Sequence, residues 1–472
     1  MTEATGNWLV SLAMFGWIPL VFLAFMVLTP PRAALACYIA GWLFLPVAVF
    51  PLAGLPDYSK ATAVPLVIFL AIMLFDGRRL LQLKPHLVDL PITIFCLTPG
   101  LSSLVNGLGW YDATTAVFAK LMIWGVPYLT GRLYCATPGG RDRLAWSLLV
   151  GGLLYAPLCL WEIRMSPQLH ATFYGYHQHD WVHSLRLGGY RPMVFMHHGL
   201  MVGLWMAVAT LAGFALWRGG VVRSVLGVPL WLAVPGLLVV TVLCKSLGAL
   251  VLLVAGIVTL LGMRSLRVSL PVALLLCLPF AWVGGRVTGA WTWDEIGALT
   301  GSIEAERVRS LEYRIVAEDQ VLEKALLKPV LGWGGWDRHL RVQEGRGLRG
   351  AGQHESIATD SLWIITLGRY GFVGLAAVML ALAVPVVALW RRWPPRHWDA
   401  DRHSTVAWVL ALILAIYAID SVFNNMENPI YLLIAGGLAG IPPLRRTTHA
   451  GSPTLRVVRP VPLRTLPARG PR

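Results

Sequence analysis

The sequence predicts an all-α polytopic membrane protein with about 12 to 13 transmembrane helices and a large polar loop that carries an amphipathic helix. Of its 472 residues, 56% are hydrophobic and 13% are charged, whereas soluble domains are about a quarter charged. Apolar runs of about 20 residues recur along the chain, and each can cross ~30 Å of hydrocarbon. Backbone groups in lipid must pair within their own segment, so helices are expected.

The apolar runs give the candidate spans, in chain order. They are 8–29, 33–54, 61–76, 88–105, 115–133, 144–163, 196–217, 225–243, 248–263, 268–285, 361–390, 404–424 and 429–443. The chain is then divided into regions: 1–195, which ends in an outer loop at 164–195; central spans at 196–285; a polar insertion at 286–360; the last spans at 361–443; and a basic tail at 444–472.

The net charge of +15 is distributed as in membrane proteins, and it does not indicate nucleic-acid binding. Arginines and lysines fall on alternate connections, and the tail after Ile441 adds more arginines without any acidic residue. By the positive-inside rule, these connections and the tail lie in the cytoplasm. The long segments 164–195 and 286–360 then lie on the opposite side, and the tail is expected to be disordered near anionic lipid headgroups.

No metal site and no cofactor are predicted. The six cysteines lie in or beside apolar runs without C-x-x-C spacing, so they read as core residues rather than as a disulfide framework or a zinc site. His197 and His198 are adjacent, and neighbouring residues on a helix point about 100° apart, which is poor geometry for chelation.

The polar insertion at 286–360 holds the strongest candidates for chemistry. Apolar residues recur at helical spacing over 302–327, and Pro329 ends that helix. A glycine-rich turn follows at Gly332-Trp333-Gly334, and then His354 stands just before the next span.

Arg307 and Arg314 are seven residues apart, so they share one helix face and could clamp a diphosphate through paired hydrogen bonds. The alternative is a ladder of ion pairs with Glu304 and Glu318. His354 could take a proton from a hydroxyl as a general base, or it could be an ordinary surface histidine.

Other cations lie at the outer ends of spans. Arg186 and Arg191 end the first outer loop and offer a second contact for an anionic, lipid-linked substrate, unless they extend to lipid headgroups instead. Lys245 interrupts apolar sequence at the end of a span, where a charge is costly and often functional unless it is exposed at the interface.

These pieces, in this order, resemble the O-antigen ligase and O-antigen polymerase family of bacterial inner-membrane polysaccharide transferases. The resemblance covers about 186–375. Its motifs are Arg186-Leu187-Gly188-Gly189, Lys245-Ser246-Leu247-Gly248, Tyr313-Arg314, Pro329-Val330-Leu331-Gly332-Trp333-Gly334, His354-Glu355-Ser356 and Gly368-Arg369-Tyr370-Gly371-Phe372-Val373-Gly374-Leu375. The sequence departs from the family pattern at Glu355, where the family usually has asparagine.

The resemblance implies a metal-independent glycosyltransferase of the bacterial inner membrane with its active site on the periplasmic side. The donor would be a glycan on undecaprenyl diphosphate, and the acceptor another glycan or a lipid A core, in lipopolysaccharide or exopolysaccharide biosynthesis. Arg314, with Arg186 or Arg191, would hold the diphosphate, with Lys245 and Arg307 as further contacts. His354 would activate the acceptor hydroxyl.

Other functions stay open at this point. The variants of the same chemistry are a ligase, a polymerase and a protein O-oligosaccharyltransferase. A polysaccharide transporter or flippase is the main alternative from another class, but no internal repeat is visible and the polar residues concentrate in an outer loop. A non-catalytic assembly scaffold would tolerate loss of Arg314 and His354.

Overall fold

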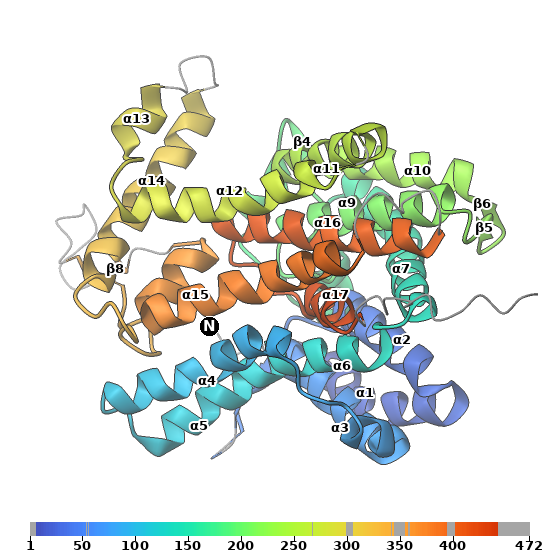
Figure 1. Ribbon diagram of the computed structural model, residues 1–472, viewed down its shortest axis with the longest axis horizontal. Coiled ribbons are helices and arrows are strands. Elements are labelled where there is room, and N and C mark those ends of the chain that lie inside the picture. The colour runs from blue at the N-terminus through green and yellow to red at the C-terminus, as the bar shows by residue number, and fades with distance from the viewer. Residues whose placement is uncertain are drawn as a thin grey trace, which may run out of the picture. The chain divides into compact units, whose positions relative to one another are not determined.

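The computed structural model describes residues 6–52, 54, 56–266, 268–298, 305–340, 342–343, 355–356, 359–393 and 402–441. Over these residues the chain forms a helical bundle with four two-stranded hairpins, which confirms the all-α class (Figure 1). The helices are α1 (Trp8–Val27), α2 (Pro30–Phe44), α3 (Lys60–Leu81), α4 (Leu90–Val105), α5 (Gly109–Lys120), α6 (Val126–Tyr134), α7 (Pro138–Met165), α8 (Leu169–Tyr174), α9 (Gly199–Arg218), α10 (Leu230–Leu243), α11 (Leu247–Leu266), α12 (Leu270–Val287), α13 (Trp293–Ala298), α14 (Ala305–Ala325), α15 (Leu362–Arg392), α16 (Arg402–Phe423) and α17 (Pro429–Ala439).

Short elements connect these helices. The antiparallel hairpins pair β1 (Val49–Phe50) with β2 (Tyr58–Ser59), β3 (Leu185–Arg186) with β4 (Gly189–Tyr190), β5 (Ser224–Val225) with β6 (Val228–Pro229), and β7 (Val342–Gln343) with β8 (Glu355–Ser356). The remaining turns are η1 (Leu87–Asp89), η2 (Leu121–Gly125), which is a π-helical turn between α5 and α6, and η3 (Trp181–Ser184).

Among the described residues, nine helices are long and apolar enough to cross a membrane, as a multi-pass protein requires. Nine of the 13 candidate spans coincide with these helices, and the spans expected at 33–54, 115–133, 225–243 and 429–443 do not. The span expected at 115–133 is divided among α5, η2 and α6, and the one expected at 429–443 is reduced to the short helix α17. The span expected at 33–54 ends at Phe44 and gives way to the β1–β2 hairpin. Likewise, the span expected at 225–243 begins with the β5–β6 hairpin and becomes helical only at Leu230. Both runs are apolar throughout, so composition alone did not reveal the turns.

The bundle has an inner and an outer set of helices. In the most apolar stretch of α16, 89% of the residues are buried, and in α9 83% are buried. The corresponding figures are 22% for α12 and 28% for α1. The exposed residues of these two helices are mostly large apolar side chains, as contact with lipid requires. We infer that α9 and α16 form the centre of the bundle and that α1 and α12 face the membrane.

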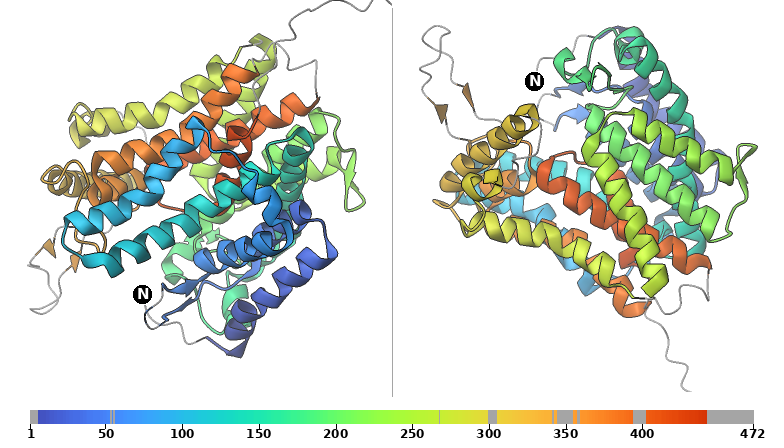
Figure 2. Two further views of the ribbon diagram at one scale, coloured as in Figure 1. Left: turned by 60° about the horizontal axis from the view of Figure 1, so that its bottom comes forward. Right: turned by 90° about the horizontal axis from the view of Figure 1, so that it is seen from above.

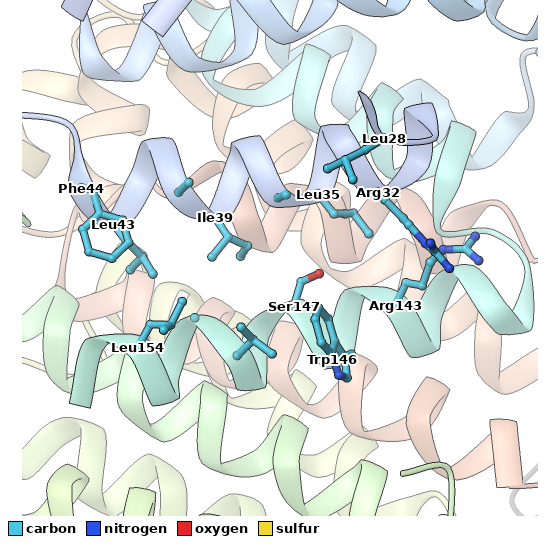
Figure 3. Close-up of a pocket in the computed structure, with 14 residues that line it drawn as sticks. Leu28, Arg32, Leu35, Ile39, Leu43, Phe44, Arg143, Trp146, Ser147 and Leu154 are labelled. Atoms are coloured by element: carbon cyan, nitrogen blue, oxygen red, sulfur yellow. The ribbon is translucent and has the colours of Figure 1, made fainter. Parts of the chain in front are cut away.

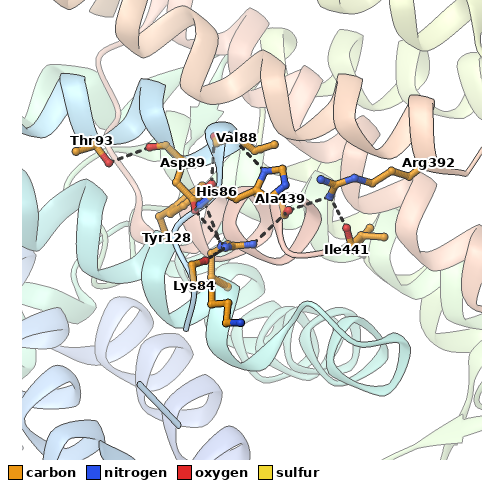
Figure 4. A network of polar contacts seen from close by, with 10 residues as sticks. Lys84, His86, Val88, Asp89, Thr93, Tyr128, Arg392, Ala439 and Ile441 are labelled. Carbon is orange, nitrogen blue, oxygen red and sulfur yellow. Dashed lines mark hydrogen bonds and ion pairs between the residues drawn. The ribbon is translucent and has the colours of Figure 1, made fainter. Parts of the chain in front are cut away.

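Several basic connections meet at one end of the bundle (Figure 4). Arg132 at the end of α6 pairs with Asp89, and its guanidinium also donates to the carbonyl oxygens of Lys84 and Ala439. Arg392 at the end of α15 donates to the carbonyls of Ala439 and Ile441 after α17. These contacts bring the ends of α6, α15 and α17 together with η1.

The polar insertion lies at the other end of the bundle, with α13 and α14 (left in Figure 1), and α14 packs on α15 (Figure 1 and Figure 2). The helix predicted at 302–327 is confirmed as α14 over Ala305–Ala325. Its buried face includes Ile315, Val321 and Leu322. The buried Arg286 at the end of α12 fixes α14 by donating to the carbonyl of Ile315 at 3.0 Å and to Asp319 at 2.7 Å.

The glycine-rich turn after α14 fits into a kink of α15. The kink is at Gly371, whose φ of 63° and ψ of −166° are not helical. The amide of Phe372 donates to the carbonyl of Pro329 at 2.7 Å, and the amide of Trp333 donates to that of Gly368 at 2.9 Å. Two sequence motifs therefore form one structural joint, which fixes the end of α14 relative to α15.

Candidate functional site

A polar cavity of about 320 Å³ lies at the end of the bundle that carries α14. Its walls come from the loop between α8 and α9, from α14, from the residues before α15 and from the connection between α16 and α17. They are formed by His179, His183, Arg186, Arg191, His198, Leu200, Arg314, Ala317, Glu318, Thr359, Asp360, Ser361 and Met426. Three arginines from two regions that are distant in sequence thus surround one space.

The loop before α9 is held in place by a buried carboxylate. Glu162 of α7 accepts hydrogen bonds from the amides of Met193 and Val194, both at 2.8 Å, and from the amide of Leu169 at 3.0 Å. Gln178 then donates to the carbonyl of Val194 at 3.1 Å. These bonds satisfy backbone groups that would otherwise be buried without partners, so the loop is well defined where it carries the site residues.

Arg191 is the most buried cation of the cavity, with 6% of its surface exposed. Its guanidinium donates to the carbonyl of Lys245 at 3.4 Å, and its Nε has no hydrogen-bond partner among the described residues. Burial, together with the charges of Arg186 and Arg314, lowers the pKa of Arg191 to about 10. It therefore stays charged at neutral pH and is suited to an anionic ligand.

Arg314 reaches the cavity from α14. Its guanidinium lies 3.6 Å from the carboxylate of Asp360 and donates to the carbonyl of Phe423 at 3.4 Å. The ion pair with Glu318 considered from the sequence is not what orients Arg314. Glu318 lies beside Arg286 and accepts a hydrogen bond from the hydroxyl of Ser361.

Arg186 and Lys245 meet at the β3–β4 hairpin. Arg186 is opposite Gly189 in that hairpin and lines the cavity. Lys245 does not line it. Its ammonium group donates to the carbonyl of Leu187 at 3.4 Å, and its own carbonyl accepts from Arg191. The structure thus places Lys245 behind the hairpin, where it supports the arginines.

A cluster of histidines lies beside these arginines. The ring of His179 lies 4.8 Å from that of His183, 5.2 Å from His197 and 4.8 Å from His198, measured between centroids. Burial, reinforced by His179 and Arg191, lowers the pKa of His198 to about 3. Burial and the neighbouring His183 also lower the pKa of His179.

His198 also has a defined tautomer. Its Nδ1 accepts a hydrogen bond from the amide of Leu200 at 3.0 Å and so caps α9. The neutral ring must then carry its proton on Nε2. In the described part of the chain, no group of three or more His, Cys, Asp or Glu side chains could hold a metal ion.

A second cavity, of about 260 Å³, adjoins the first through Met426, which lines both. It contains Lys60, His197 and Glu427. The connection that carries Met426 is fixed because Glu427 pairs with Lys120 at 2.8 Å and accepts from the indole of Trp124 at 2.7 Å. Burial opposes ionisation of Glu427, but Lys120 overcomes this effect and the pKa of Glu427 is lowered.

The predicted site residues are brought together only in part. Arg186, Arg191 and Arg314 line one cavity, and Lys245 lies behind it. Arg307 belongs to α14, but its side chain lies outside the described residues, and so does the whole of His354.

Sequence reasoning missed the contribution of His179, His183 and His198 to the cavity, and it missed Glu162. A signal for the histidines was present, because they concentrate in the outer loop and at the first residues of α9. Glu162 could have been suspected as a carboxylate near the end of an apolar run, where a charge requires partners.

The arrangement can bind a doubly charged anion through three guanidinium groups next to the imidazoles of His179 and His198, whose lowered pKa values favour the uncharged form. Comparisons of the sequence with models of known protein families and with curated proteins find no match.

Proposed function

We propose that this protein is a membrane glycosyltransferase that transfers a glycan from an undecaprenyl-diphosphate donor to an acceptor hydroxyl on the periplasmic face. The observation that carries the proposal is the convergence of Arg186, Arg191 and Arg314 on one cavity at the end of a membrane bundle. The resemblance of residues 186–375 to polysaccharide ligases and polymerases adds the reaction class. Within this reaction class, we propose an O-antigen ligase or a surface-polysaccharide polymerase of the bacterial inner membrane.

The charges of the cavity suit the leaving group of such a reaction. A diphosphate carries several negative charges, and arginine binds phosphate oxygens through paired hydrogen bonds. Because Arg191 is buried, its attraction for an anion is screened less by water than that of a surface arginine. The volume of about 320 Å³ suits a headgroup, so the prenyl chain and the rest of the glycan would extend beyond the cavity.

In the proposed reaction, an acceptor hydroxyl oxygen attacks the anomeric carbon of the donor sugar. The bond from that carbon to the diphosphate oxygen breaks, and undecaprenyl diphosphate leaves with the electron pair. Arg314, Arg191 and Arg186 stabilise the charge that develops on the diphosphate. The hydroxyl proton passes to a histidine acting as general base.

His354 is the base indicated by the resemblance, and the cavity offers His179 and His183 as described alternatives. An uncharged imidazole is needed for this role. The lowered pKa of His179 favours that form at neutral pH, although it also weakens the ring as a base.

The proposal is tested with purified protein in nanodiscs that receives a radiolabelled undecaprenyl-diphosphate glycan, candidate acceptors and EDTA. The variants are Arg314→Ala, Arg191→Ala, His354→Ala, His179→Ala and His183→Ala. Arg164→Ala is the matched control, because Arg164 is an exposed arginine at the end of α7 that does not line the cavity. Folding is verified by gel filtration and thermal melting.

The expected result is transfer by the wild type and by Arg164→Ala, a loss of about 100-fold or more in Arg314→Ala and Arg191→Ala, and no effect of EDTA. The histidine variant that loses activity identifies the base, and the product size separates a polymerase from a ligase. Equal transfer in all variants would show that the cavity is not the active site. Absence of transfer with any acceptor, together with passage of the lipid-linked glycan across a vesicle bilayer, would favour a flippase.

A further inference from the structure

An apolar groove of about 710 Å³ runs between α2 and α7 (Figure 3), and none of the residues that line it also lines the polar cavity. Leu43, Phe44 and Leu154 lie at one end of the groove, and Arg32 and Arg143 lie together at the other. Trp146 and Leu154 are 42% and 49% exposed, so the groove opens on the surface of the bundle. Since α7 is a candidate membrane span, this surface faces lipid.

The groove has the length of one membrane leaflet. From Arg143 to Leu154, α7 rises about 16 Å at 1.5 Å per residue. From Arg32 to Phe44, α2 rises about 18 Å by the same measure. One leaflet contributes about half of the ~30 Å hydrocarbon thickness. The groove therefore accommodates acyl chains of the leaflet whose headgroups lie at the level of the two arginines.

The two arginines provide an unsatisfied anion site at the headgroup level. Neither Arg32 nor Arg143 has an acidic partner in the described part of the chain, and Nε of Arg143 is buried without a hydrogen-bond partner there. The nearest carboxylate in sequence, Asp142, instead contacts His403 at 2.7 Å. Two guanidinium groups that share one space repel each other, and a phosphate between them would remove that repulsion.

We propose that this groove binds one anionic phospholipid, with its phosphate between Arg32 and Arg143 and an acyl chain along α2 and α7. Phosphatidylglycerol represents this class. The site is distinct from the polar cavity, because Arg143 lies near the start of α7, whereas Glu162, which holds the loop of the polar cavity, lies near its end. The inference does not depend on the proposed function.

The test uses delipidated protein and measures lipid retention by native mass spectrometry together with the midpoint of thermal unfolding. The probes are dioleoyl-phosphatidylglycerol, dioleoyl-phosphatidylcholine and glycerol 1-phosphate, which has a phosphate but no acyl chains. The charge variant is Arg32→Gln/Arg143→Gln. The packing variant is Ala36→Phe, which fills the groove at an exposed position and keeps both arginines.

The matched control is Arg223→Gln/Arg264→Gln, which removes two exposed arginines that do not line the groove. In the wild type and the control, phosphatidylglycerol should bind at least about five-fold more tightly than phosphatidylcholine and raise the unfolding midpoint. Each of the two groove variants should either lose the preference for phosphatidylglycerol over phosphatidylcholine or lose the binding of phosphatidylglycerol. Arg32→Gln alone, at an exposed position, replaces the double variant if the latter does not fold.

Several outcomes would overturn the proposal. The first is equal binding of the two lipids by the wild type, and the second is undiminished binding of phosphatidylglycerol by both groove variants. The third is a rise in the unfolding midpoint with glycerol 1-phosphate that equals the rise with phosphatidylglycerol. The last outcome would assign a free phosphate site in place of a lipid site.

Discussion

Arg286 and Glu318 form an ion pair inside the protein, with 3.4 Å between Nε and Oε2 and both side chains almost fully buried. The pair joins α12 to the first long helix of the polar insertion. Burial raises the pKa of Glu318, although the hydroxyl of Ser361 and the charge of Arg286 oppose that rise. The position of α14 therefore depends on both charges of this pair, because each side chain would be a buried charge without the other.

The first prediction concerns this pair. Arg286→Met should lower the free energy of unfolding by about 3 to 5 kcal/mol, because it leaves Glu318 buried without its cation. Glu318→Gln should cost less, since the amide oxygen can still accept from Ser361. The double variant should be more stable than Arg286→Met alone. Chemical denaturation in detergent measures all three, and strictly additive losses would show that the two side chains are not coupled.

The second prediction concerns the kink in α15. Gly371→Ala should destabilise the protein by at least about 2 kcal/mol, because only glycine adopts its backbone angles readily and an added Cβ would lie 2.3 Å from the carbonyl carbon of Val330. Gly248→Ala in α11 is the control, since its added Cβ meets nothing within 4 Å. The midpoint of thermal unfolding is the readout. Equal midpoints for the two variants would mean that the joint does not contribute to stability.

The fold class could be predicted from the sequence because apolar length is decided locally: about 20 apolar residues can satisfy their backbone groups in lipid only as a helix. The amphipathic helix α14 could also be predicted from local sequence, because its apolar residues recur at helical spacing and Pro329 ends the helix. The hairpins that shorten α2 and α10 could not be predicted. Their residues Val49–Phe50 and Ser224–Pro229 lie next to apolar residues, so the turns do not lower the hydropathy of the runs that contain them.

The sequence could predict which charged residues form the candidate site, but not which residues they contact. Arg186 and Arg191 were recognised as cations at the end of the outer loop before a span, and Arg314 was recognised because it shares one face of the predicted helix with Arg307. That Glu318 contacts Arg286, rather than Arg314 one helical turn away, depends on how α14 packs against α12. Local spacing cannot decide between a neighbour in the same helix and one in another helix.

The third prediction links a backbone position to the arginine cavity. An added Cβ at Gly199 would lie 2.3 Å from Cδ of Arg191, so Gly199→Ala should displace that side chain without changing any charge. Binding of farnesyl diphosphate, a soluble prenyl-diphosphate probe, should weaken about ten-fold or more, which corresponds to about 1.4 kcal/mol. Isothermal titration calorimetry measures the affinity.

A double variant separates displacement of Arg191 from a general loss of structure. If Gly199 acts through Arg191, then Gly199→Ala/Arg191→Ala should bind the probe no more weakly than Arg191→Ala alone. Gly236→Ala serves as the control, because its added Cβ meets nothing within 4 Å. Additive weakening in the double variant would contradict the assigned role of Gly199.

The fourth prediction concerns pH and rests on His198, whose pKa is lowered to about 3 in the folded protein, mainly by burial. The unfolded chain binds a proton at this residue near pH 6.5, so between about pH 6.5 and pH 3 the unfolded state holds more protons. Stability must then fall as the pH is lowered through that range, by up to about 1.4 kcal/mol per pH unit from this residue. Between pH 7 and pH 5 the unfolding midpoint of the wild type should decrease by a few degrees.

His198→Asn isolates this effect, because asparagine can still cap α9 by accepting from the amide of Leu200 but does not titrate. The midpoint of this variant should change less between pH 7 and pH 5 than that of the wild type. His86→Asn is the matched control, since His86 also caps a helical turn by accepting from Val88 but is exposed. It should keep the pH dependence of the wild type. An unchanged pH dependence in His198→Asn would show that His198 is not the residue whose protonation opposes folding, and that another histidine with a lowered pKa, such as His179, carries the effect.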